Sequence, residues 1–317
     1  AFILVYLLFV VFLCLPILVS EYALGRRTQK NAFGAFKMLS KNKSWSLIGI
    51  FAVLAAVCVL SFYCVVGGWS VKYLVESCKF NMPILDSSYF TGFISSSFAP
   101  VIYTLIFLAL TGSVLVLGIQ KGIERFSKVM MLLLCLLIIL IAIRSVTLPG
   151  AMEGMKYMFV PNLNALNGKA LLEALGQSFF SLSIGCGTVL TYASYVSKKE
   201  NIITTSFMIA AFDTLFALVA GIAIIPAVFA IAYMNGATPE IGAGPGLVFI
   251  TLPSVFNAMP MGNIVAILFF VTLLIAAITS AISLMETFVT YEIEEWKLSR
   301  TKSLLLAFAI CSVLGII

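Results

Sequence analysis

Long apolar stretches separated by short polar connections constrain the fold of this chain more than any other feature. Each stretch can cross the roughly 30 Å hydrocarbon core of a bilayer as a helix. The residues are 62% hydrophobic and only 10% charged, which excludes a soluble domain. We therefore predict an all-α, multi-pass membrane protein. The apolar stretches cover roughly residues 1–22, 45–76, 98–118, 128–147, 170–196, 203–234, 262–294 and 303–317.

Composition also excludes several functions. The 317-residue chain contains no histidine, which removes imidazole-based catalysis and the commonest zinc sites. The seven cysteines are scattered, and because only Cys78 falls in a predicted loop, a disulfide framework is not expected. We attribute the net charge of +6 to membrane topology rather than to nucleic-acid binding.

The distribution of Lys and Arg predicts the orientation of the chain, because cytoplasmic loops carry an excess of these residues. Alternate connections hold Arg26, Arg27, Lys30, Lys37, Lys41, Lys43, Lys121, Arg125, Lys128, Lys198, Lys199, Lys297, Arg300 and Lys302. The opposite connections hold only Lys72, Lys79, Arg144, Lys156 and Lys169. The first set is therefore predicted to be cytoplasmic, and the first apolar stretch runs from outside to inside. Residues 31–44 are predicted to form a basic surface helix.

The stretch 170–196 contains the sequence GQSFFSLSIGCGTVLTYASY. Gly185 and Gly187 flank Cys186, and each glycine disfavours a helix by roughly 1 kcal/mol relative to alanine. An unwound backbone inside a membrane survives only where it is buried in protein or lines a wet cavity. Transporters use such broken helices to bind substrates and ions. We predict a broken helix at 170–196, and the alternative is an unbroken helix whose small residues allow close packing.

Polar side chains in two other stretches suggest cation binding. Asp213 is predicted near mid-membrane, where an ionised carboxylate costs at least about 2.5 kcal/mol unless it is paired. No Lys or Arg is predicted at that depth, so Na⁺ is the natural partner, and bonding to neighbouring hydroxyls is the alternative. Ala276, Thr279 and Ser280 share one helix face. A carbonyl with two hydroxyls suits Na⁺, although such residues equally suit helix packing.

The stretch 176–195 resembles the sixth transmembrane helix of the neurotransmitter:sodium symporter family, in particular of its bacterial amino-acid transporters. The residues that carry the resemblance are Gly176-Gln177, Phe179-Phe180-Ser181-Leu182-Ser183, Gly185-Cys186-Gly187 and Thr191-Tyr192-Ala193-Ser194-Tyr195. The resemblance continues in register over essentially the whole chain, including Glu21–Arg27 and the loop Gly118–Lys128. It implies a LeuT-like inverted-repeat fold. Residues 1–317 would be a single transporter domain, truncated at both ends and covering helices two to nine, with a re-entrant-like outer loop at 235–261.

The resemblance also implies site residues, position by position. The first sodium site would use Ser181 and Asp213, and the second would use Ala276, Thr279 and Ser280. The outer gate would contain Tyr63 and Phe180, and the inner gate Tyr195 and Glu294. The substrate would bind among Val59, Tyr63, Phe180, Ser183, Cys186, Ser280 and Leu284.

Some family members bind chloride beside the first sodium site, whereas others carry a fixed acid nearby. Tyr6, Gln177 and Ser181 match residues around the chloride position, and Asp213 stands where asparagine is common. Ala217 stands where some chloride-independent members keep their acid. Asp213 would then both ligate Na⁺ and supply the negative charge, so chloride is not expected to be required.

The function implied by the resemblance is sodium-coupled symport of neutral, hydrophobic or aromatic amino acids by alternating access. The substrate residues include no charge, which disfavours an ionic substrate side chain. The implied partners are an amino acid, Na⁺ at two sites and the lipid of a bacterial cell membrane, and no nucleic acid is expected.

An amino-acid/polyamine-type transporter of the same fold and a channel are the alternatives. An enzyme is not expected, because the chain combines no histidine with a single deep carboxylate. The chain departs from the family at Leu132, which replaces the proline that follows the position of Gly122. This departure questions whether the family's unwinding of the fifth helix applies here.

Overall fold

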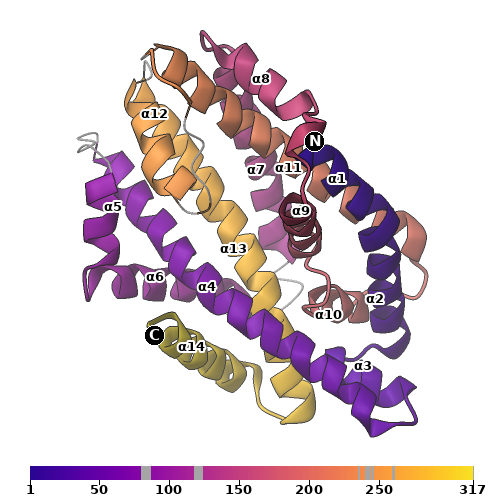
Figure 1. Cartoon of the computed structure of the whole chain (residues 1–317). Helices are drawn as coiled ribbons and strands as arrows, with labels where there is room; N and C mark the ends of the chain where they lie inside the picture. The colour runs from indigo at the N-terminus through magenta and orange to yellow at the C-terminus, as the bar shows by residue number, and fades with distance from the viewer. Residues whose placement is uncertain are drawn as a thin grey trace. The chain divides into compact units, whose positions relative to one another are not determined.

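The computed structural model describes residues 1–79, 87–117, 124–234, 236–239, 244, 246–258 and 261–316 (Figure 1). Within these ranges the chain is helical and contains no strand. Six helices are long and apolar enough to span a membrane, namely Phe2–Thr28, Ser46–Cys78, Ala99–Val116, Arg125–Val146, Ile202–Met234 and Gly262–Glu295. The predicted all-α class is confirmed.

The elements follow one another along the chain as α1 (Phe2–Phe9), the π-helical turn η1 (Val10–Cys14), α2 (Leu15–Thr28), α3 (Ala32–Leu39), η2 (Lys43–Trp45), α4 (Ser46–Cys78), α5 (Ser87–Ile94), α6 (Ala99–Val116), α7 (Arg125–Val146), α8 (Ala151–Phe159), η4 (Leu163–Ala165), α9 (Gly168–Ser181), α10 (Thr188–Ser194), α11 (Ile202–Met234), η5 (Leu247–Thr251), α12 (Leu252–Ala258), α13 (Gly262–Glu295) and α14 (Arg300–Ile316). The predicted surface helix in 31–44 is α3. The predicted outer loop 235–261 contains η5 and α12, and part of it lies outside the described residues, as does Gly122.

The chain divides into two compact units. Unit 1 contains Ala1–Phe62, Pro161–Leu215 and Ala281–Leu314, and unit 2 contains Tyr63–Val160, Phe216–Ser280 and Gly315–Ile317. That the whole chain acts as one transporter domain stays a prediction.

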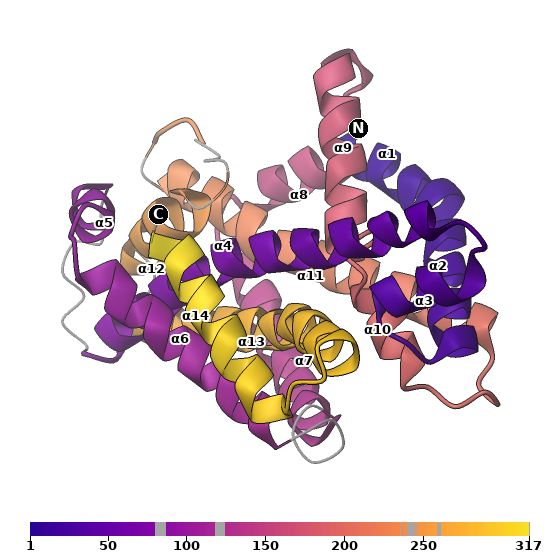
Figure 2. The ribbon, with the colours of Figure 1, turned by 90° about the horizontal axis from the view of Figure 1, so that it is seen from below.

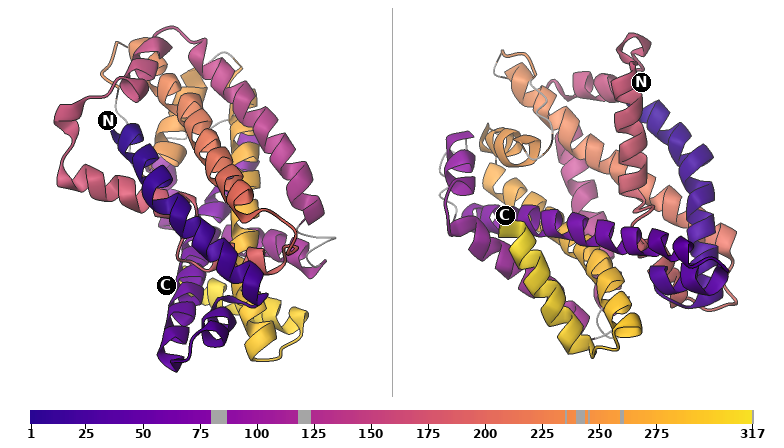
Figure 3. Two further views of the ribbon diagram at one scale, coloured as in Figure 1. Left: turned by 90° about the vertical axis from the view of Figure 1, so that its right-hand side faces the viewer. Right: turned by 60° about the horizontal axis from the view of Figure 1, so that its bottom comes forward.

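Unit 1 is built around the long helix of α1, η1 and α2, which the ribbon follows without interruption (Figure 3). The π-helical turn ends two residues before Pro16, which has no amide proton to donate and whose ring crowds the preceding turn. Helix α9 packs against α1, and α10 packs against α2. A Cβ at Gly25 would lie 2.1 Å from the carbonyl oxygen of Leu190, so only glycine permits this close contact between α2 and α10.

Unit 2 has an aromatic core. Tyr73 of α4 and Phe270 of α13 are completely buried and contact each other, and Phe249 of η5 packs against both. The ring centroids of Tyr73 and Phe249 are 5.1 Å apart, and Trp69 contacts the edges of Phe90 and Phe249. These rings bring α4, α5, η5 and α13 together. Helices α5, α8 and α12 were not anticipated individually from the sequence, because each is too short to give a membrane-spanning signal.

Candidate ion and substrate sites

The predicted helix break is present. Helix α9 ends at Ser181 and α10 begins at Thr188, so residues 182–187 connect two separate helices (Figure 1). Ser183, Gly185 and Gly187 have φ angles of 53°, 83° and 68°, in the left-handed region. Glycine adopts this region without the steric penalty that other residues incur. The glycines flanking Cys186 therefore allow the backbone to unwind where the sequence predicts it.

Glu21 satisfies part of the unwound backbone. Its Oε1 atom accepts a hydrogen bond of 2.8 Å from the amide of Gly185. This bond pairs one backbone amide of the unwound segment, and unpaired amides are unfavourable inside a membrane. Sequence reasoning noticed Glu21 only as part of the Glu21–Arg27 motif and assigned it no role. A carboxylate inside the apolar first stretch, about two turns before the end of α2, was the available signal.

Both residues predicted for the first sodium site meet beside the break. The Ser181 hydroxyl donates a hydrogen bond of 2.5 Å to Oδ2 of Asp213, and the Tyr6 hydroxyl donates one of 3.4 Å to Ser181. Gln177 lies one turn earlier on α9 and is exposed. The carboxylate and hydroxyl oxygens are hard donors of the kind that Na⁺ prefers. As a result, three of the four residues predicted around the chloride position form one chain of hydrogen bonds.

The three residues predicted for the second sodium site lie in unit 2, on α13. The Thr279 hydroxyl donates to the carbonyl oxygens of Ala276 and Ile275, at 3.0 and 3.1 Å. Ser280 follows and is exposed. Hydroxyl and carbonyl oxygens are hard donors of the kind that Na⁺ takes as ligands. This arrangement therefore suits Na⁺ ligation, and it equally suits a helix that satisfies its own hydroxyl.

The predicted substrate residues divide between the units. Unit 1 holds five of them, namely Val59, Phe180, Ser183, Cys186 and Leu284, and unit 2 holds Tyr63 and Ser280. Within unit 1, Leu284 is buried, whereas 49% of Phe180 is exposed. Ser183 and Cys186 lie in the unwound segment itself.

Tyr195, predicted for the inner gate, joins a buried ion pair that the sequence did not reveal. The carboxylate of Glu286 is fully buried, and Arg300 contacts both of its oxygens, with N–O distances of 2.6 and 3.2 Å. The Tyr195 hydroxyl donates to Glu286 at 3.0 Å and lies 2.5 Å from the Thr290 hydroxyl. The available signal was an acid inside an apolar stretch of α13, with Arg300 following 14 residues later at the start of α14.

Glu294, the other predicted inner-gate residue, has a different set of partners. Its Oε2 atom accepts hydrogen bonds from the backbone amide and side-chain Nδ2 of Asn31, at 3.0 and 2.8 Å. The neighbouring Glu295 lies 3.7 Å from the Lys37 amine. The carboxylates at the end of α13 thus bind α3 at the predicted cytoplasmic side.

Membrane-spanning helices and a broken helix lined by polar oxygens together define a multi-pass secondary transporter. Sequence comparison agrees, because the chain matches the Sodium:neurotransmitter symporter family over residues 1–92 and 93–317. The chain belongs to this family. It is a sodium-dependent symporter integral to the membrane, and the predicted family and transporter class are confirmed.

Individual relatives support this assignment. An uncharacterized sodium-dependent transporter of Bacillus subtilis, YhdH, is 40% identical over 315 residues, which cover 96% of this chain and 68% of YhdH. Another uncharacterized sodium-dependent transporter, from Haemophilus influenzae, is 34% identical over 329 residues, or 99% of this chain and 71% of its own length. The crystal structure of MhsT in complex with L-phenylalanine matches with a TM-score of 0.90 at 39% identity, covering 100% of this chain and 71% of MhsT. The match confirms the predicted LeuT-like fold.

Proposed function

We propose that this transporter couples the sodium gradient to uptake of neutral amino acids with hydrophobic or aromatic side chains. The observation that carries the proposal is the absence of charge among the predicted substrate residues of unit 1, Val59, Phe180, Ser183, Cys186 and Leu284. An ionic substrate side chain would lose its hydration there without gaining a counter-charge. The similarity to MhsT, which binds L-phenylalanine in its crystal structure, supports the same substrate class.

Sodium coupling is proposed to involve two sites. Ser181 and Asp213 provide hydroxyl and carboxylate oxygens at the end of α9, and Ala276, Thr279 and Ser280 provide a carbonyl and two hydroxyls on α13. The unwound segment 182–187 exposes backbone groups that would bind the amino and carboxylate groups of the substrate. Alternating access would then present these groups to each side of the membrane in turn.

Competition uptake tests the substrate class. Leucine, phenylalanine and tryptophan are expected to inhibit uptake of a labelled hydrophobic amino acid, whereas glutamate and lysine are not. Tyr63→Phe should weaken binding by about 1–3 kcal/mol, because the substrate carboxylate would lose a hydroxyl donor. Tyr157→Phe is the matched control, since Tyr157 is a 62% exposed residue of α8. Stronger inhibition by glutamate or lysine than by leucine would overturn the proposed class.

A further inference from the structure

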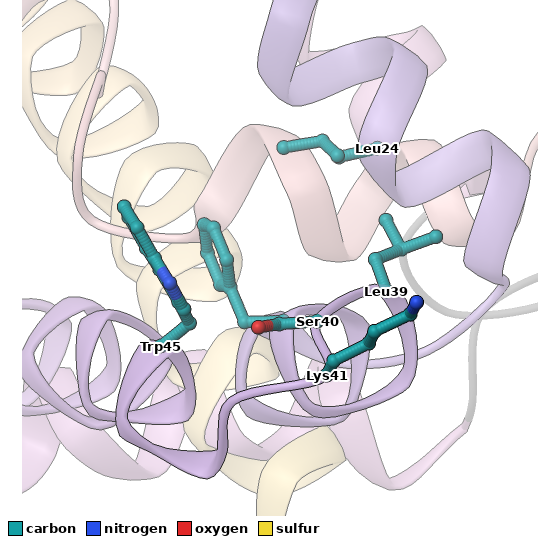
Figure 4. Close-up of a pocket in the computed structure, with 6 residues that line it drawn as sticks. Leu24, Leu39, Ser40, Lys41 and Trp45 are labelled. Carbon is teal, nitrogen blue, oxygen red and sulfur yellow. The ribbon is translucent and has the colours of Figure 1, made fainter.

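A groove opens on the predicted cytoplasmic side of unit 1, away from the ion and substrate residues. It encloses about 370 Å³. Figure 4 shows the groove, with Leu24 of α2 on one side and Leu39, Ser40, Lys41 and Trp45 on the other. The lining residues are Leu24, Phe36, Leu39, Ser40, Lys41 and Trp45. Its wall is thus mostly apolar, with one amine and one hydroxyl.

Local hydrogen bonds hold the groove in shape. The Asn31 side chain caps α3 by accepting from the amide of Gly34 at 2.9 Å. Helix α3 lies beside α2 (Figure 2). It buries Ala32 and Ala35. In the following turn, the Ser40 hydroxyl bonds the carbonyl and the amide of Asn42, at 2.9 and 3.1 Å. The turn that carries Lys41 is therefore held by the Ser40 side chain, which donates to the carbonyl of Asn42 and accepts from its amide.

The apolar wall continues onto the exposed surface at the start of α4. Trp45 is 56% exposed, and the residues after it are also exposed, with 51% for Leu47 and 67% for Phe51. An exposed tryptophan between a basic turn and an apolar helix face is typical of the membrane–water interface. Acyl chains are the expected neighbours of Leu47 and Phe51. A lipid that follows this surface would place its headgroup beside Lys41.

Charge complementarity favours an anionic headgroup. The sequence contains no acidic residue between Tyr22 and Val75, whereas the same range includes six basic residues before Ser44, namely Arg26, Arg27, Lys30, Lys37, Lys41 and Lys43. Lys41 is exposed, and Lys37 is 62% exposed in its side chain, with Glu295 only at 3.7 Å. Each basic residue near a membrane surface adds about 1 kcal/mol of attraction to anionic lipid.

We propose that this groove binds an anionic glycerophospholipid of the inner leaflet. Lys41 contacts the phosphate, and Leu24, Leu39 and Trp45 contact the glycerol and the first methylenes of the acyl chains. The other possible occupants are a zwitterionic phospholipid and a free phosphate ion. Quenching of Trp45 by labelled lipids distinguishes these occupants from one another.

The test places the transporter in phosphatidylcholine nanodiscs that contain a small fraction of brominated phosphatidylglycerol or brominated phosphatidylcholine. Bromine quenches the fluorescence of a nearby tryptophan. Subtracting the fluorescence of the Trp45→Phe variant from that of the wild-type protein gives the emission of Trp45 alone. Phosphatidylglycerol is expected to quench Trp45 at a lower mole fraction than phosphatidylcholine. Lys41→Gln should reduce this preference about fivefold, which corresponds to one lost surface charge.

Lys302→Gln is the matched control, because Lys302 is an exposed basic residue of the same predicted face but lies on α14. This variant should keep the preference of the wild-type protein. Leu39→Ser should reduce quenching by both lipids. Equal quenching by the two lipids, an equal effect of Lys302→Gln, or loss of quenching on adding inorganic phosphate would each overturn the proposal.

Discussion

At the scale of single residues, the pairing of Asp213 with Ser181 carries the most specific expectation about ion use. The carboxylate accepts a 2.5 Å hydrogen bond from Ser181, and Tyr6 extends this chain. A fixed negative charge at this position can neutralise a bound Na⁺, because opposite charges a few Å apart stabilise each other's charged form. We therefore expect transport that does not require chloride.

Asp213→Asn keeps the shape of the side chain and removes its charge. Sodium affinity should fall about tenfold or more, since a partner carrying charge contributes about 1.5–3 kcal/mol. Transport by this variant should also become stronger in chloride than in gluconate. Ser181→Ala is the control, because it removes a ligand and keeps the charge, so it should weaken Na⁺ binding without a chloride response. Wild-type uptake that stops in gluconate would refute the role of Asp213.

Some site residues could be predicted from the sequence and others could not, for a physical reason. Asp213 was visible because a lone acid in an apolar stretch is unfavourable unless it is paired. The roles of Glu21 and Glu286 depend on partners distant in the chain, with Glu21 lying 164 residues from Gly185 and Glu286 91 residues from Tyr195. Local composition carries no information about such pairs. The sequence shows which positions carry polar side chains. Only the fold shows which of these side chains contact one another.

At the scale of elements, the apolar stretches predicted the long helices, and the glycines predicted the break between α9 and α10. The sequence did not indicate the π-helical turn before Pro16, because the residues around it have the same apolar character as the rest of the helix. Gly176 and Gly185 illustrate the difference between composition and conformation. Both are glycines of the same stretch, yet only Gly185 has a positive φ, of 83°.

Gly185→Ala should therefore destabilise the protein by about 1–3 kcal/mol, the usual cost of a non-glycine residue in a strained region. A Cβ at Gly185 would meet no atom within 4 Å, so backbone strain alone is tested. Gly176→Ala is the matched control, since it lies inside α9 and is equally free of contacts. It should stabilise the helix by roughly 0.5–1 kcal/mol. Thermal unfolding of both variants measures the difference, and equal effects of the same sign would contradict the assigned conformation.

At the scale of the whole molecule, hydropathy predicted a multi-pass membrane protein, and the match to its family confirms that class. The predicted ion sites divide between the two compact units, with Asp213 in unit 1 and Thr279 in unit 2. Neither periodicity nor charge could reveal this division, because most of the boundaries, including those in α4, α11 and α13, fall inside continuous helices. Sodium-coupled transport would require residues of both units, because predicted ion-site residues lie in each of them.

Linkage between sodium and substrate tests this account most directly. We expect Na⁺ to increase the affinity of the transporter for a hydrophobic amino acid. The amino acid should increase the affinity for Na⁺ by the same factor, because coupling between two binding sites is reciprocal. The measurement is equilibrium binding of labelled leucine across a sodium series, with K⁺ replacing Na⁺ at constant ionic strength. An affinity that falls steeply as K⁺ replaces Na⁺ is the predicted result, and an equal affinity in the two ions would contradict the account.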